Sequence, residues 1–152
     1  MFSEREVLEI AIRMEKNGED EYRKAAGALT DPTLVASLEW MADEEHEHAK
    51  FFTALLEEMD ARAKSHFGEE LDATFLKDLI GGSSLSLKTV DFSEVEDITE
   101  LLNIYIGFEE DSILFYEMIT PMIDNLDTRF QVERIIAEER GHIKRLKELA
   151  YA

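Results

Sequence analysis

The sequence predicts an all-α protein, built as an antiparallel four-helix bundle with one long crossover between the second and third helices. Two observations support this prediction. Apolar residues recur every three or four positions along four separate stretches, as they do on the buried face of a helix. The pattern lapses between the second and third stretches, from about residue 65 to residue 92. A connection of that length lets the chain cross from one end of a bundle to the other.

The first helix is expected from residue 4 to residue 28. Ser3 and Glu6 have the spacing of a capping box at its start. Asp31 and Pro32 then suit the cap and first position of the next helix, so the loop is short and the two helices must be antiparallel neighbours. The apolar stripe includes Glu15, and its other members are Val7, Ala11, Met14, Gly18, Tyr22, Ala25 and Leu29.

The second helix is expected from about residue 32 to 64. Glu45 and His48 occupy positions on its buried face where the pattern calls for apolar residues. Trp40 and Phe51 are interpreted as packing in the core or at a subunit contact. The residues around the motif that fall on other faces are interpreted as solvated surface: Asp43, Glu44, His46 and Glu47.

The third helix is capped either by Ser93 with Glu96 or by Asp97 with Glu100, and it should end near Thr120. The fourth runs from about residue 127 to 149. Glu109 lies within the apolar stripe of the third helix, and Glu139 and His142 lie within that of the fourth. We expect one domain over residues 1–152, with helices in about 4–64 and 93–150.

The two halves of the chain are related by an internal repeat. The sequence Glu-Glu-x-x-His occurs twice, 94 residues apart, and the same offset aligns residues of the first and third helices without a gap. The aligned pairs include Glu15 with Glu109, Tyr22 with Tyr116, Glu45 with Glu139, and His48 with His142. The chain therefore reads as a duplicated helix pair.

Composition excludes several classes of function. The net charge of −19 argues against nucleic acid and anionic membrane as partners. The absence of cysteine excludes disulfides, iron–sulfur clusters and thiolate nucleophiles. The N-terminal residues lack the features of a signal peptide, and no apolar stretch has the length of a membrane span, so a cytoplasmic location is expected.

Folding the repeats together would gather four carboxylates and two imidazoles in one core. Buried carboxylates without counter-charge repel each other and lose hydration. Two divalent cations would balance the four negative charges, and oxygen and imidazole donors favour iron, with manganese or zinc as alternatives. The competing interpretation treats both histidines as ordinary helix residues paired with nearby acids. The six candidate metal ligands are Glu15, Glu45, His48, Glu109, Glu139 and His142.

These motifs resemble the rubrerythrin branch of the ferritin-like superfamily, and the resemblance covers all four helices. It implies a ferritin-like bundle with two iron ions. Glu45 and Glu139 would be similar to the family's bridging carboxylates, and the glutamates of the first and third helices to its terminal ones, while each histidine would bind one metal. Tyr22 and Tyr116 resemble tyrosines that lie behind the ligands in the family; core packing is the alternative for both.

Two departures from the family pattern bear on function. Rubrerythrins usually carry a second glutamate three residues after the third-helix ligand, and here that position is Ser112, with Gly18 as its counterpart. Full rubrerythrins also have a Cys-rich, rubredoxin-like domain that delivers electrons, so this cysteine-free chain would need a separate donor. Gly18, Gly107 and Gly141 lie inside helices near the ligands and would either permit close helix approach or leave room for a small oxidant.

We therefore expect a di-iron oxidoreductase that reduces peroxide or dioxygen in the defence against oxidative stress. The first alternative is a ferroxidase that oxidises ferrous iron for storage or detoxification, and the second is a scaffold with a vestigial metal site. Aromatic residues such as Trp40, Phe51 and Phe67 exceed what one bundle can cover, so a homodimer or larger homo-oligomer is expected.

Overall fold

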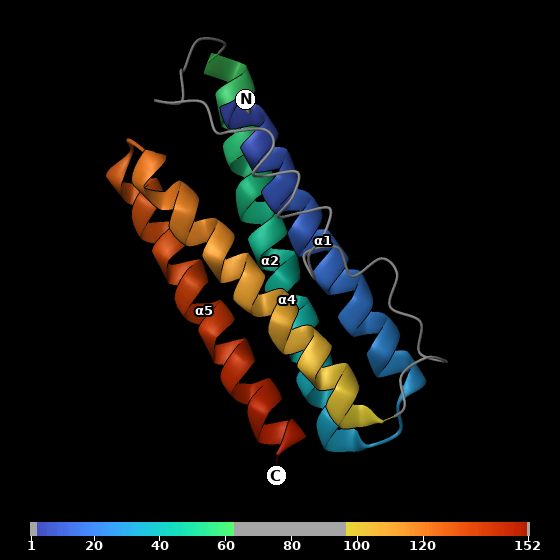
Figure 1. Ribbon diagram of the computed structural model, residues 1–152. Coiled ribbons are helices and arrows are strands. Elements are labelled where there is room, and N and C mark those ends of the chain that lie inside the picture. The colour runs from blue at the N-terminus through green and yellow to red at the C-terminus, as the bar shows by residue number, and fades with distance from the viewer. Residues whose placement is uncertain (1–2, 63–96, 152) are drawn as a thin grey trace. The chain divides into compact units, whose positions relative to one another are not determined.

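The computed structural model describes residues 3–62 and 97–151, which form four α-helices and one short 3₁₀ turn (Figure 1). No strand occurs in these two ranges. The expected crossover and the last two residues of the expected second helix lie outside them. The chain divides into two compact units, and each holds one helical hairpin. The elements are α1 (Glu4–Ala28), α2 (Pro32–Arg62), α4 (Ile98–Ile119), η2 (Thr120–Met122) and α5 (Leu126–Ala150).

Side-chain caps set the starts of α1 and α2. The Glu6 amide donates to Ser3 Oγ at 3.3 Å, and the Ser3 amide donates to Glu6 Oε2 at 2.7 Å, which completes the expected capping box. Asp31 Oδ1 accepts from the amides of Thr33 at 2.9 Å and Leu34 at 3.1 Å. These acceptors satisfy amides that have no partner within the first helical turn.

Helices α1 and α2 run side by side in opposite directions, as the blue and green ribbons of Figure 1 show. Cross-helix pairs confirm the direction, because Arg23 pairs with Asp43 at 3.0 Å near the loop and Arg5 pairs with Asp60 at the far end. Burying a large apolar side chain stabilises the folded state by about 1.5–3 kcal/mol, and this hairpin buries several side chains completely. They include Val7, Ala11, Tyr22, Leu38, Met41 and Phe52.

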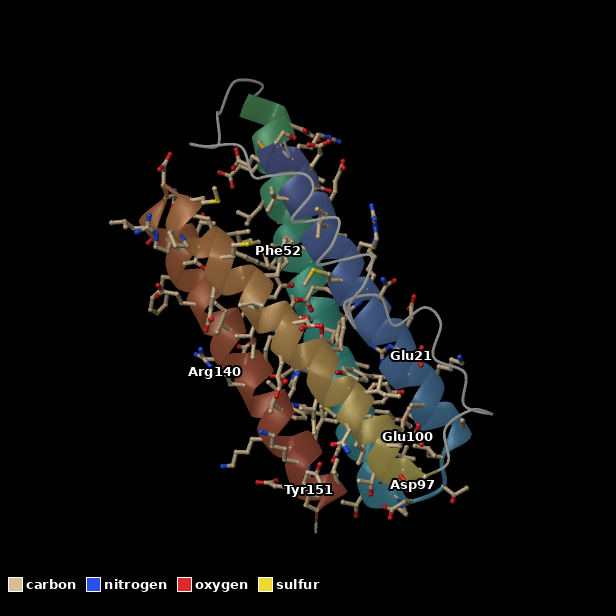
Figure 2. The ribbon with its side chains drawn as sticks, viewed as in Figure 1. Glu21, Phe52, Asp97, Glu100, Arg140 and Tyr151 are labelled. Atoms are coloured by element: carbon tan, nitrogen blue, oxygen red, sulfur yellow. The ribbon has the colours of Figure 1, made fainter. Side chains whose placement is uncertain are left out.

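Asp97 caps α4, which decides between the two expected capping pairs. Its Oδ1 accepts from the Glu100 amide at 2.7 Å, and Figure 2 shows the two residues together at the start of the helix. Ser93 lies outside the described residues. After the turn η2, Asn125 caps α5 by accepting from the Thr128 amide at 3.0 Å.

The α4–α5 hairpin is antiparallel as well. Tyr151 Oη donates to Asn103 Oδ1 at 2.7 Å at one end, and Arg140 pairs with Glu117 at 2.5 Å further along. Its core is apolar and aromatic, with Leu101, Leu102, Tyr105, Phe108, Phe115, Tyr116, Val132 and Leu146 almost fully buried. No helix in the described ranges has both the length and the apolar character of a membrane span.

Candidate metal centre

The first hairpin brings three of the expected ligands together. Glu15 comes from α1, and Glu45 and His48, three residues apart and so on one face, come from α2. Their relative exposures are 1%, 1% and 3%. His48 Nδ1 lies 3.3 Å from Glu15 Oε2. Each of the three residues offers a ligand atom within 4.8 Å of those of the other two.

The second hairpin builds the same arrangement from the repeat counterparts. Glu109 comes from α4, and Glu139 and His142 come from α5. All three side chains are fully buried. His142 Nδ1 lies 3.2 Å from Glu109 Oε1 and 3.3 Å from Glu139 Oε2, and the ligand atoms again lie within 4.8 Å of one another.

The two triads match in detail. In each hairpin the Nδ1 atom of the histidine faces the glutamate of the preceding helix, at 3.3 Å for His48 and 3.2 Å for His142. An antiparallel hairpin with the same register in both halves produces this match. The 94-residue repeat in the sequence is therefore also a repeat in the geometry.

The second triad is electrostatically unfavourable when no cation is bound. Burial raises the pKa of Glu109 well above its ordinary value, repulsion by Glu139 raises it further, and His142 partly offsets both. With a neutral imidazole, two ionised glutamates carry two negative charges, which one divalent cation balances. The donors in each triad are carboxylate oxygens and an imidazole nitrogen, with no sulfur, and they fit iron or manganese, with zinc as a competitor.

Tyr22 and Tyr116 are both fully buried. Each lies seven residues, or about two helical turns, after the glutamate of its helix, and so on nearly the same face. These buried positions are compatible with each of the two expected roles of the tyrosines, which are to lie behind a triad or to pack in the hairpin core. Their role in the chemistry stays a prediction.

The surface interpretation of the residues around the first motif is confirmed. Asp43, His46 and Glu47 are exposed, whereas Glu44 is half-buried, and His46 Nδ1 lies 3.0 Å from Glu19 Oε1 at the surface. Trp40 is 44% exposed, so core packing is wrong for it and a contact with another chain stays a prediction.

Two features near the site add to the sequence-based expectations. A Cβ placed at Gly141 would meet no atom within 4 Å in the described part of the chain, so close helix approach does not explain this glycine.

Glu21 of α1 is buried, although it was not among the residues expected in the core or at the site. The repeat carries a signal that could have found it, because its counterpart 94 residues later is the buried Phe115.

Comparisons with known proteins agree with this architecture. A search of curated proteins finds no match. A crystal structure described as that of a ferritin-like diiron-carboxylate protein from Thermotoga maritima matches with a TM-score of 0.72 at 24% identity, covering 98% of this chain and 95% of that chain. The likeness shows the fold, and confirms the expected ferritin-like four-helix bundle.

The family model for rubrerythrin matches residues 6–150, which include both glutamate–histidine triads and all four helices apart from the first two residues of α1. The resemblance inferred from the motifs is thereby confirmed, and the chain belongs to the rubrerythrin family.

Proposed function

We propose that this chain is a di-iron oxidoreductase that reduces peroxide or dioxygen with electrons from a separate donor. One observation carries the proposal: each hairpin buries two carboxylates and one imidazole whose ligand atoms lie within 4.8 Å of one another. Burying ionisable groups in this way is costly unless a cation compensates the charge. Membership of the rubrerythrin family supports iron as that cation.

In this proposal the two triads serve one dinuclear centre, which has four glutamates and two histidines as protein ligands. The ferritin-like fold and the matched geometry of the two hairpins support this arrangement. Glu45 and Glu139, which resemble the family's bridging carboxylates, would hold the ions from α2 and α5. Glu15 and Glu109 would hold them from α1 and α4, and His48 and His142 would complete the set of protein ligands.

Bound iron would supply the electrons and the Lewis acidity for reduction of the oxidant. The six buried side chains would hold the ions in place, the four carboxylates would balance their charge, and the burial of every candidate ligand would keep bulk water away. Tyr22 and Tyr116 support the ligands from behind. The chain contains no cysteine, which favours an electron donor on a separate protein or small molecule.

The test uses iron-loaded protein that is first reduced and then mixed with peroxide without oxygen. Loss of peroxide, together with oxidation of the iron, is expected in the wild type and not in Glu45→Ala. The matched control is Glu47→Ala, which removes an exposed carboxylate two residues away and should behave as the wild type does. Reduced, iron-loaded wild type that leaves both peroxide and, in a parallel reaction, dioxygen intact contradicts the proposal.

Iron oxidation for storage or detoxification is the second candidate, and the net charge of −19 favours it because an acidic protein attracts ferrous ions. It predicts many irons retained per chain and a large hollow assembly. A dimer that retains only the ions of its own centre favours the first candidate. A vestigial site, in contrast, predicts that Glu45→Ala leaves the metal content unchanged.

A further inference from the structure

Glu21 is a buried carboxylate that the proposed metal centre does not use. It lies on α1 (Figure 2), its side chain is 6% exposed, and Oε1 is enclosed without a hydrogen-bond partner among the described residues. Burial raises the pKa of Glu21, while Lys24 lowers it. An ionisable group held in this way costs free energy of folding, because it loses hydration without gaining a full set of hydrogen bonds.

Glu21 belongs to a row of residues that leads to the candidate metal centre. Glu15, Gly18 and Glu21 are spaced three apart on α1, so they form one ridge of the helix. Side chains on a helix lean toward its N-terminus, so Glu21 is expected to lie over the turn that contains Gly18, which is the turn between Glu21 and Glu15. Gly18 is buried and has no side chain to block this path.

The distance along the ridge suits a short chain of water molecules. Neighbours three apart on a helix have Cβ atoms about 5–6 Å apart, so those of Glu15 and Glu21 are about 10 Å apart. Because both side chains lean the same way along the helix, their carboxylates lie about as far apart as their Cβ atoms, and about two or three waters would bridge them. The enclosed Oε1 of Glu21 is the polar atom that such a water would contact.

The repeat shows that the ridge is specific to the first hairpin. Its counterparts on α4 are Glu109, Ser112 and Phe115. Ser112 Oγ donates to the Phe108 carbonyl at 3.0 Å, and Phe115 is fully buried, so apolar packing replaces the second carboxylate. The equivalent position of the second hairpin therefore holds a large apolar side chain, so the helical hairpin as such does not require an acid there.

We propose that Glu21 is a proton-transfer residue, which passes protons from solvent along the Gly18 ridge toward Glu15 and the metal centre. This inference rests on the proposed function. Reduction of one peroxide to two waters consumes two protons and two electrons, and the separate donor provides the electrons. For each proton, the Glu21 carboxyl gives up its own to the adjacent water and takes another from solvent at its exposed edge, beside Lys24.

The test compares Glu21→Gln with Asp20→Asn in the full, iron-loaded chain. Asp20 is the exposed neighbour, so its substitution makes the same change of charge without touching the ridge. Peroxide turnover should fall about tenfold or more in Glu21→Gln, with unchanged iron content and a larger solvent isotope effect. In Glu21→Ala, added formate should restore part of the rate, which loss of packing alone would not allow.

A measurement on metal-free protein provides a readout besides activity. When the pH is raised, an infrared carboxylic-acid band that responds to exchange into heavy water should persist above pH 4.5 in the wild type and in Asp20→Asn, and should be diminished in Glu21→Gln. Turnover in Glu21→Gln equal to that of an active wild type overturns the proton role and leaves the proposed function intact. Loss or slower uptake of iron in Glu21→Gln also overturns it, because the residue then serves metal binding. A wild type without turnover contradicts the proposed function, and the proton role with it.

Discussion

Replacing Glu109 by glutamine should stabilise the metal-free protein and weaken its stabilisation by metal. Glu109 is fully buried, and ligand atoms of Glu109 and Glu139 lie within 4.8 Å of each other. Without a cation, the folded chain must either tolerate their repulsion or take up a proton. Glutamine removes the charge and keeps nearly the same shape, so it relieves that cost.

Two estimates of the cost agree. At 4.8 Å and an effective dielectric constant of about 20, two carboxylates repel by about 3.5 kcal/mol. Protonating a carboxyl group with an ordinary pKa of 4.5 at pH 7 costs at most about 3.4 kcal/mol. The metal-free chain adopts whichever state is lower in free energy, the repelling pair or the protonated carboxyl. Because His142 offsets part of the repulsion, we expect Glu109→Gln to gain about 1–3 kcal/mol. The midpoint of thermal unfolding should then rise by about 3–10 °C.

The gain should depend on pH with a defined sign. The pKa of Glu109 is raised in the folded state, so the folded metal-free chain binds this proton more tightly than the unfolded chain does. Protonation therefore favours folding at low pH, and that contribution is lost as pH rises above 4.5 toward the folded pKa. The advantage of Glu109→Gln should be small at acidic pH and largest near neutrality.

Thermal unfolding with chelator and with added Mn²⁺ or Fe²⁺ measures both effects. Metal at about 100 times its dissociation constant should stabilise the wild type by about 2.7 kcal/mol, and Glu109→Gln by less. Glu110→Gln is the control, because Glu110 is exposed and adjacent. A metal-free Glu109→Gln protein less stable than the wild type at pH 7 would refute the electrostatic reasoning, as would equal stabilisation of both by metal.

Three further predictions concern the fold and the residues around the ligands. Asp31→Ala removes the cap of α2 and should lower stability by about 1 kcal/mol, or about 2–4 °C in the unfolding midpoint; an unchanged midpoint would contradict the role of the cap. Arg140→Ala breaks an exposed pair with Glu117, so calorimetry should find a loss below about 1 kcal/mol and iron content should not change. Tyr22→Phe and Tyr116→Phe should keep the iron and lower peroxide turnover, whereas unchanged turnover would assign both rings to core packing.

The sequence predicted the helices and identified the candidate ligands because both depend on local patterns. Ser3, Asp31 and Asp97 are caps whose partners lie two or three residues away, so spacing alone identifies them. Glu45 and His48 interrupt an apolar stripe, and the 94-residue repeat then locates the other ligands without any structure. Local patterns do not determine how the helices assemble into one bundle, so the ferritin-like bundle was confirmed by comparison with a solved structure.

Two residues show where the periodicity of apolar residues was insufficient. Glu21 lies on a flank of α1 that the stripe did not include, although its counterpart Phe115 indicates a buried position. Trp40 was expected in the core or at a subunit contact; it is 44% exposed, which excludes the core and leaves the contact as a prediction. In both cases the depth of burial depends on packing across helices, which residue spacing along one helix does not contain.

Elemental analysis tests the central claim most directly. Protein grown with ample iron and purified without chelator should contain about two irons per chain, and both Glu45→Ala and His142→Ala should lose them, since each removes a ligand from a different hairpin. Wild type without metal, with stability unchanged on addition of ferrous iron, would contradict the account. So would variants that keep the iron content of the wild type.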